Sequence, residues 1–118
     1  LSRAQKIQKR ASQVGFDWKG VDGPLGKIEE ELLELRDSLS TGDGDQIKSE
    51  LGDLLFSCVN LSRHLNLDAE ESLRCATAKF EKRFVTMENE MGQSGRLDKD
   101  LSMADYDALW EKAKKLNL

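Results

Sequence analysis

Hydrophobic residues recur at helical spacing along most of the chain, and short polar segments interrupt them. The pattern predicts helices over residues 2–14, from about 24 to 39, over about 46–65, from 69 to about 91, and a short one after 102. The segments 15–20, 41–45 and 92–96 each contain two glycines and are expected to be loops. Since no segment alternates convincingly like a strand, we predict an all-α fold of four to five helices, an antiparallel helical bundle in a single domain over 1–118.

Three of these helix starts carry side chains suited to a first turn or a cap. Asp68, with Glu71 three residues later, is predicted to cap the fourth helix, and Ser102 with Asp105 repeats the signal for the last one. Pro24 suits the first turn of the second helix, where its missing N–H leaves no hydrogen bond unmade. These residues therefore mark three helix starts more closely than hydrophobic spacing alone.

The third helix is apolar around well over half of its circumference. Its apolar residues are Leu51, Leu54, Leu55, Phe56, Cys58, Val59 and Leu61. Such a helix has to be buried on several sides, and a chain of 118 residues has little room to bury it alone. We therefore predict a homodimer or a dimer of dimers, with this helix in the shared core.

Composition and charge narrow the class of partner. The net charge of −4 argues against a nucleic-acid duplex, because backbone binding needs a strong basic excess, but it leaves nucleotides open. No apolar run is long enough to span a membrane, and the first residues lack a signal-peptide stretch. We therefore expect no membrane partner and a cytoplasmic location.

Two acidic pairs on the second and third helices carry the main chemical signal. Glu31 and Glu34 lie one turn apart, and Glu50 and Asp53 repeat that spacing. Taken alone, Glu31 and Glu34 fit a solvated helix face better than a site. Glu50 and Asp53 are harder to explain in that way, because carboxylates on a mostly buried helix are costly unless paired or bound to metal. If the two helices pack antiparallel across their short loop, the pairs meet.

The second pair belongs to a longer polar stripe on the apolar third helix. At about 100° per residue, Glu50, Asp53, Ser57 and Asn60 form a stripe roughly 80° wide. This stripe is the most informative feature of the chain.

Carboxylates that face one another repel, and a multivalent cation relieves the repulsion. All-oxygen ligands, with no His or Cys among them, favour Mg²⁺ or Mn²⁺ over zinc. Mg²⁺ keeps several waters and is commonly completed by phosphates, so the expected substrate is a phosphoryl compound. A di-iron site would need Glu-x-x-His pairs, and the single histidine, His64, does not complete one.

The acidic motifs resemble those of MazG-type nucleoside triphosphate pyrophosphohydrolases. Glu30-Glu31-x-x-Glu34 is similar to the EExxE motif of that family, and Glu50-x-x-Asp53 is similar to its ExxD motif. Further segments resemble MazG in the same order: VGFDW at 14–18, ELGDLLF at 50–56, VNL at 59–61, KFEKRF at 79–84 and LWEKAK at 109–114. The resemblance covers nearly the whole chain and is greatest to the C-terminal of the two domains in longer MazG proteins.

The resemblance implies hydrolysis of a nucleoside triphosphate to the monophosphate and pyrophosphate, as nucleotide-pool housekeeping. The implied Mg²⁺ ligands are Glu31, Glu34, Glu50 and Asp53. The implied substrate contacts are Lys79, Arg83, Trp110 and Lys114, and spacing adds Lys27 and Asn60 as candidates. Water would attack a phosphorus in line, and Glu30 or Glu34 would take its proton.

Simpler interpretations stay open for several of these residues. Lys79 and Arg83 could merely solvate their helix, and Trp110 could be a core anchor. Phe16 and Trp18 could stack on a base, although fixing the loop is the favoured role. At the level of function, the rivals are an enzyme restricted to dUTP or phosphoribosyl-ATP and a non-catalytic helical interaction module.

Overall fold

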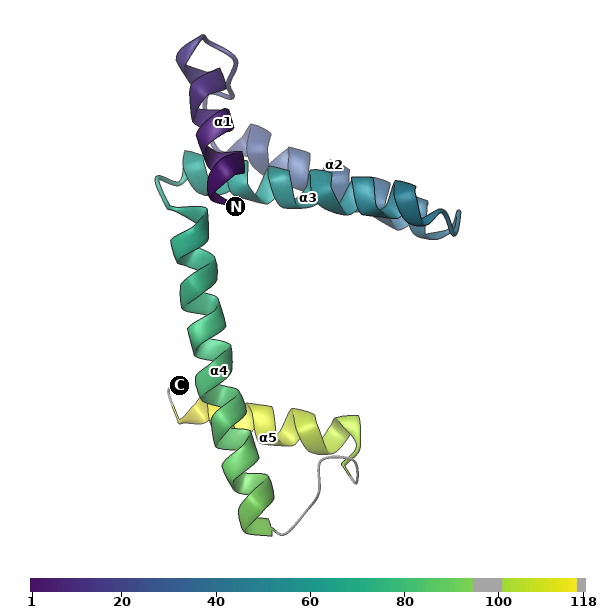
Figure 1. Cartoon of the computed structure of the whole chain (residues 1–118), viewed down its shortest axis with the longest axis vertical. Helices are drawn as coiled ribbons and strands as arrows, with labels where there is room; N and C mark the ends of the chain where they lie inside the picture. Colours follow the sequence, from purple (N-terminus) through teal and green to yellow (C-terminus); the bar gives the residue numbers. More distant parts are fainter. Residues whose placement is uncertain (95–100, 117–118) are drawn as a thin grey trace. The chain divides into compact units, whose positions relative to one another are not determined.

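The computed structural model describes residues 1–94 and 101–116. It contains five helices: α1 (Ser2–Gln13), α2 (Asp22–Leu39), α3 (Gly44–His64), α4 (Ala69–Ser94) and α5 (Met103–Lys115) (Figure 1). These residues contain no strand, which confirms the predicted all-α class. The chain divides into two compact units, Leu1–Ser72 and Leu73–Leu118. None of the described helices is long and apolar enough to cross a membrane.

The second and third helices begin slightly earlier than their hydrophobic spacing predicts. α2 begins at Asp22, so that Pro24 lies in the first turn, where proline is tolerated. α3 begins at Gly44 because the side chain of Asp43 caps it, accepting from the backbone N–H groups of Asp45 at 3.0 Å and Gln46 at 3.4 Å. The predicted start near residue 46 was therefore about two residues too late, because the prediction did not include the Asp43 cap.

The two predicted caps further along the chain are confirmed. The Asp68 carboxylate accepts from the N–H groups of Glu70 at 2.9 Å and Glu71 at 3.4 Å. At the start of α5, the Ser102 hydroxyl accepts from the Asp105 N–H, and the Asp105 carboxylate accepts from the Ser102 N–H. This reciprocal pair is a capping box.

The fourth helix is longer than its sequence indicates. It continues through Gly92 to Ser94, so the loop expected from residue 92 was wrong for its first three positions. A glycine inside a helix costs only about 1 kcal/mol and does not by itself end it. Residues 95 and 96 of the expected loop lie outside the described residues.

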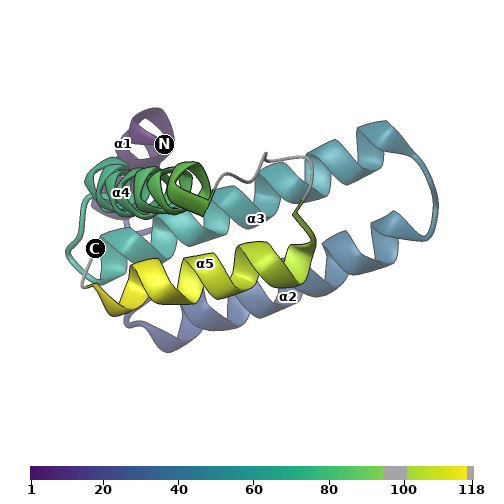
Figure 2. The ribbon, with the colours of Figure 1, turned by 90° about the horizontal axis from the view of Figure 1, so that it is seen from below.

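α2 and α3 run antiparallel, side by side, and form the largest helix–helix contact (Figures 1 and 2). The connection between them turns at Gly42, whose φ of +70° is a conformation that glycine adopts without strain. α1 packs on α3, and the Gln8 side-chain amide donates to the backbone carbonyl of Phe56 at 2.9 Å. The hairpin of α2 and α3 thus positions the two acidic pairs, and α1 lies beside the C-terminal half of α3.

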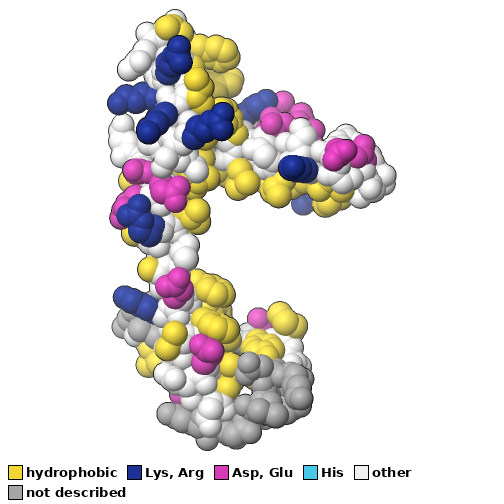
Figure 3. All heavy atoms as spheres, viewed as in Figure 1, with side chains coloured by type: hydrophobic (Ala, Val, Ile, Leu, Met, Phe, Trp, Pro, Cys, Tyr) yellow, Lys and Arg dark blue, Asp and Glu magenta, His cyan; other side chains and the backbone are white. Residues whose placement is uncertain are grey.

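Much of the apolar surface of α3 remains open to solvent in the single chain. Leu51, Leu55 and Phe56 are 46%, 51% and 47% exposed. Figure 3 shows hydrophobic side chains at the surface of the α2 and α3 pair. The burial predicted for this helix is therefore not reached within the described part of one chain.

Candidate metal and substrate site

The hairpin brings carboxylates from both helices together. Oxygen atoms of Glu31 on α2 and of Glu50 and Asp53 on α3 all lie within 4.8 Å of one another. A second set on α2, formed by Glu30, Glu31 and Glu34, meets the same distance. The antiparallel packing therefore produces the meeting of acidic pairs that the spacing of these residues predicts.

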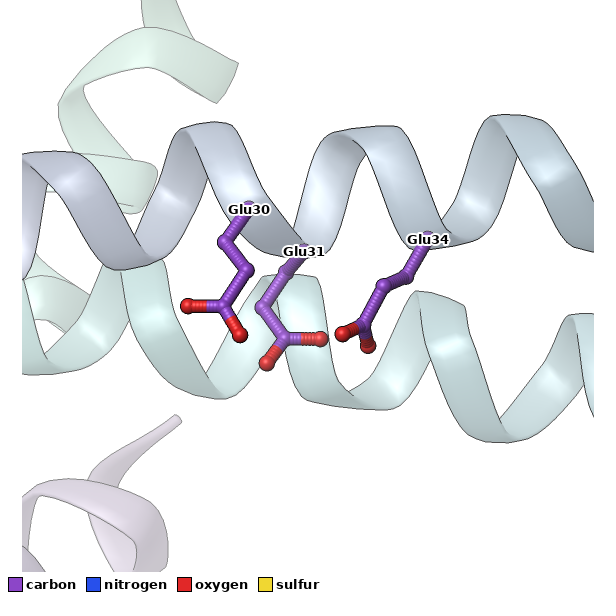
Figure 4. Close-up of side chains that lie close together, drawn as sticks. All are labelled: Glu30, Glu31 and Glu34. Atoms are coloured by element: carbon purple, nitrogen blue, oxygen red, sulfur yellow. The ribbon is translucent and has the colours of Figure 1, made fainter.

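Figure 4 shows how the three glutamates of α2 are arranged. Glu30, Glu31 and Glu34 leave the helix on the same side, and the carboxyl group of Glu34 points back toward that of Glu31. Residues three and four positions apart share a helix face, which explains this convergence. Glu31 is the member common to both acidic sets.

Burial makes this cluster different from a solvated acidic face. Glu31 is only 5% exposed, and Glu50 is partly buried. One oxygen of each, Oε2, is buried and accepts no hydrogen bond from the described residues. A buried carboxylate oxygen without a partner is costly. The solvated-face interpretation of Glu31 is therefore wrong.

Lys27 is the one cation paired with the cluster among the described residues. Its Nζ lies 3.0 Å from Glu31 Oε1 and 3.4 Å from Glu30 Oε1. These contacts raise the pKa of Lys27, chiefly through the hydrogen bond to Glu31. One ammonium group reaches only one of the two Glu31 oxygens, so the acidic excess of the cluster remains.

The excess of negative charge appears at Glu34. Its pKa is raised above the usual range, first by the hydrogen bond with Glu31, then by repulsion from that carboxylate, with Glu50 adding a smaller contribution. Neighbouring carboxyl groups cannot all ionise easily, because their negative charges repel, and the pKa of one of them rises. Glu34 is thus a carboxyl group that holds a proton more readily than an isolated glutamate.

The donor set fits a hard divalent cation. All candidate ligands are carboxylate oxygens, the ligand type that Mg²⁺ and Mn²⁺ prefer. The unpartnered Oε2 atoms of Glu31 and Glu50 are the acceptors that such an ion would satisfy. The chemistry and the burial of these oxygens therefore agree.

Ser57 and Asn60 belong to the polar stripe of α3, beyond the carboxylates. Ser57 is buried, and Asn60 accepts a hydrogen bond at 2.9 Å from the guanidinium of Arg63. Asn60 thus has a protein partner of its own.

The other substrate candidates belong to the second unit. Lys79 and Lys114 are exposed, and the Arg83 guanidinium carbon lies 5.0 Å from the centre of the Trp110 ring. Phe80 packs against the same indole, with ring centres 5.4 Å apart. Trp110 is thus anchored by neighbours on α4, which agrees with the simpler interpretation of that residue. Because these residues and the acidic cluster lie in different units, their role toward a substrate stays a prediction.

A polar cluster at the end of α3 was not foreseen from the sequence. The guanidinium of Arg63 donates to Asp17 at 3.0 Å, and His64 Nε2 lies 2.9 Å from the same carboxylate. The hydrogen bond from Arg63 is the main cause that lowers the pKa of Asp17 from 3.8 to about 2. The side chain of His64 has little exposed surface in this cluster. Asp17 belongs to the segment VGFDW, and its two partners lie more than forty residues away in sequence.

Comparison with known proteins confirms the resemblance. The MazG nucleotide pyrophosphohydrolase domain matches residues 25–88, a range that includes both acidic pairs. The chain is 51% identical over 114 residues to the nucleoside triphosphate pyrophosphohydrolase/pyrophosphatase MazG of Thermotoga maritima, covering 97% of this chain and 44% of that protein. It is 39% identical over 117 residues to the nucleoside triphosphate pyrophosphohydrolase of Escherichia coli K12, covering 98% of this chain and 44% of that protein.

The chain therefore spans less than half the length of these relatives. The domain match extends over more than half of the chain, and the identities extend over nearly all of it. On both grounds, this chain belongs to the MazG nucleotide pyrophosphohydrolase family.

Proposed function

We propose that this chain hydrolyses nucleoside triphosphates to the monophosphate and pyrophosphate, with a divalent cation held between α2 and α3. The observation that carries the proposal is the convergence of Glu31, Glu50 and Asp53 oxygens within 4.8 Å. The two relatives support the reaction, since both are named as nucleoside triphosphate pyrophosphohydrolases.

The ligands we propose for the cation are Glu31, Glu34, Glu50 and Asp53. Mg²⁺ is the expected ion, and Mn²⁺ would suit the same oxygens. When bound, such an ion draws charge from phosphate oxygens and favours attack at phosphorus. The protein's own contribution is to hold the carboxylates in place, since positioning supplies most of the rate in phosphoryl transfer.

Glu30 and Glu34 are the two candidates for the proton acceptor from the attacking water. Glu30 pairs with Lys27. Glu31 and Glu50 raise the pKa of Glu34 in the metal-free cluster, whereas a cation held by Glu34 itself would oppose that increase. We therefore propose that either Glu30 or Glu34 takes the proton.

Cations and polar groups outside the acidic cluster are proposed to hold the nucleotide. Lys27, Lys79, Arg83 and Lys114 would contact the triphosphate, and Asn60 and Trp110 would contact the nucleoside. Cations held in place stabilise the negative charge that develops on the phosphates during the reaction.

The chain is further proposed to act as a homodimer or a dimer of dimers. The exposed apolar side chains of α3, Leu51, Leu55 and Phe56, support this assembly. A second copy would remove them from water, which is the main driving force for association.

Pyrophosphate release from a panel of nucleotides tests the proposed activity. Wild-type protein with Mg²⁺ is expected to release pyrophosphate. The Glu50→Gln variant should release it at least about a hundredfold more slowly, which is the usual effect of removing a group that stabilises charge in the transition state. Glu29→Gln is the matched control, because Glu29 is exposed on α2 and lies outside both acidic sets.

The panel also separates the alternatives. Turnover confined to dUTP or phosphoribosyl-ATP would indicate the narrower enzyme. A folded protein that releases no pyrophosphate from any nucleotide would contradict the proposal and favour the interaction module.

A further inference from the structure

Asn60 is the last residue of the polar stripe on α3. It follows Asp53 by seven residues, which places the two positions roughly 20° apart around the helix axis and about 10 Å apart along it. Ser57, which is buried, lies between them. A ribose and its 5′-phosphates span a distance of this order. The position of Asn60 therefore fits a contact with the nucleoside of a triphosphate whose phosphates bind at the carboxylates.

Arg63, one turn further along α3, determines which end of the Asn60 amide is available. Its guanidinium Nη2 lies 2.9 Å from Asn60 Oδ1. A guanidinium group carries only donors, so it can face the amide oxygen but cannot accept from the amide NH2. The two ends of an asparagine amide are similar in shape, and the chemistry of the neighbour decides between them. Arg63 therefore fixes the orientation of Asn60.

The amide NH2 is the group of Asn60 that remains available. Nδ2 donates to no group among the described residues. It is also absent from the buried polar atoms that lack a partner, so it keeps surface that a ligand can reach. Asn60 thus presents a hydrogen-bond donor, while its oxygen is engaged by Arg63.

Asp17, in the loop before α2, holds the Arg63 guanidinium in place. Arg63 Nη1 donates to Asp17 Oδ2 at 3.0 Å, and Nη2 donates to Oδ1 of the same carboxylate. The backbone N–H of Trp18 and Nε2 of His64 also contact Oδ1, each at 2.9 Å. A guanidinium held by two parallel hydrogen bonds has little freedom to rotate. The direction of the Nη2 donor toward Asn60 is therefore set by the loop.

We infer that Arg63 and Asp17 are positioning residues of the substrate site, which act through Asn60 by fixing its NH2 as a hydrogen-bond donor to an oxygen of the nucleoside. The inference rests on the proposed function, because it gives a direction to the Asn60 contact proposed there. An amide that is oriented in advance loses less freedom when the substrate binds. A substrate with no acceptor at this position would leave the donor unpaired, so the same arrangement selects for an oxygen.

A double-mutant cycle on nucleotide binding tests this inference without turnover. The four ribonucleoside 5′-monophosphates are titrated with Mg²⁺ by calorimetry, and the one that binds wild-type protein most tightly is the probe. Asn60→Ala and Arg63→Met should each weaken its binding about tenfold. In the Asn60→Ala background, Arg63→Met should change the dissociation constant by less than about twofold, because the residue through which Arg63 acts is already missing. Arg36→Met removes an exposed arginine of α2 and is the matched control, which should bind like wild type.

Two further readouts separate positioning from a general effect on the fold. Arg63→Lys keeps a donor for Asn60 and should recover part of the lost affinity, although its ammonium lacks the planar fork. In assays of pyrophosphate release, Arg63→Met should raise KM much more than it lowers kcat, because the contact is already made in the bound substrate. If Arg63→Met does not fold, Arg63→Lys replaces it in the cycle, and its smaller loss should likewise vanish in the Asn60→Ala background.

The outcomes distinguish this inference from the proposed activity. Coupled effects of the two substitutions in a protein that releases no pyrophosphate would support the positioning role and contradict the activity. Pyrophosphate release together with effects that multiply, or an Arg63→Met protein that binds like wild type, would overturn the positioning role alone. If none of the four monophosphates binds, the same cycle is measured on KM, and the absence of both binding and turnover overturns both proposals.

Discussion

Glu31 on α2 and Glu50 on α3 each hold one buried carboxylate oxygen that accepts no hydrogen bond from the described residues. Both residues belong to the same cluster, together with Asp53. Buried carboxylate oxygens without a partner destabilise the fold unless a cation binds them. The cluster therefore links the stability of the protein to divalent metal, and that link can be measured without any substrate.

Mg²⁺ is expected to raise the melting temperature, and EDTA to lower it. If only the folded state binds the ion, Mg²⁺ at 100 times its dissociation constant adds about 2.7 kcal/mol to the free energy of unfolding. Glu50→Gln should abolish most of this increment, and Glu29→Gln should preserve it. A melting temperature indifferent to millimolar Mg²⁺ and to EDTA would remove the proposed metal site.

Asp17→Asn is expected to reduce stability in a pH-dependent way. Because Arg63 and His64 lower the pKa of Asp17 to about 2 in the folded protein, against 3.8 as its ordinary value, the ionised carboxylate stabilises the fold. That stabilisation is complete above about pH 4 and disappears as the pH falls through about 2. Urea unfolding of both proteins from pH 6 to pH 2 measures it, and a constant difference over this range would contradict the ion pair.

Gly23→Ala and Gly26→Ala should have opposite effects although both lie in α2. No atom lies within 4 Å of a methyl group at Gly26, so that substitution should raise the free energy of unfolding by about 0.5 to 1 kcal/mol. At Gly23 the methyl group meets the Trp18 ring at 2.6 Å and must displace it. Trp18 fluorescence, read in a Trp110→Phe background, should change for Gly23→Ala alone. Equal spectra for the two variants would show that the indole does not rest on Gly23.

Leu55→Glu is expected to weaken self-association of the chain. Leu55 is half exposed on the apolar side of α3. A charged side chain there would be solvated in the monomer, whereas a dimer that covers this side would have to bury it at a large cost. Ser49→Glu adds the same charge at an exposed polar position of the same helix and serves as the control. Sedimentation at micromolar concentration should show a dimer or larger species for wild type and Ser49→Glu, and a shift to monomer for Leu55→Glu. A folded wild-type monomer at that concentration would refute the proposed assembly.

Asp43→Ala is expected to lower the free energy of unfolding by about 1 kcal/mol, because it removes the cap of α3. Asp37→Ala is the control, and it should have the opposite effect. Asp37 lies in the last turn of α2, where a negative charge interacts unfavourably with the helix dipole. Chemical denaturation should therefore rank Asp37→Ala at or above wild type and Asp43→Ala below it. The reverse order would show that the cap does not stabilise α3.

The sequence predicts the helices and the acidic cluster well because both depend on local spacing. Glu31 and Glu34 share a face through three-residue spacing, and so do Glu50 and Asp53. Their meeting requires only a short antiparallel hairpin, the simplest arrangement of two neighbouring helices. Helix ends were less accurate, because Asp43 acts through a side-chain cap and Gly92 fails to end α4.

The polar contacts that join α1 and the following loop to α3 could not be predicted, because their groups come from distant segments. Gln8 reads as an ordinary polar residue of a first helix, and only its contact with Phe56, 48 residues later, shows that it is buried. Arg63 and His64 similarly read as cations at a helix end until Asp17 is placed beside them. Periodicity indicates which residues share one helix face, but it does not specify which remote segment covers that face.

The connection between α2 and α3 is only four residues long, from 40 to 43. All the carboxylates of the cluster therefore lie in one continuous hairpin, Asp22 to His64, and no remote part of the chain has to find them. Contacts of such low contact order form quickly, and closing so short a loop costs little chain entropy. The acidic cluster should consequently assemble early in folding, ahead of the contacts that α1 makes with α3.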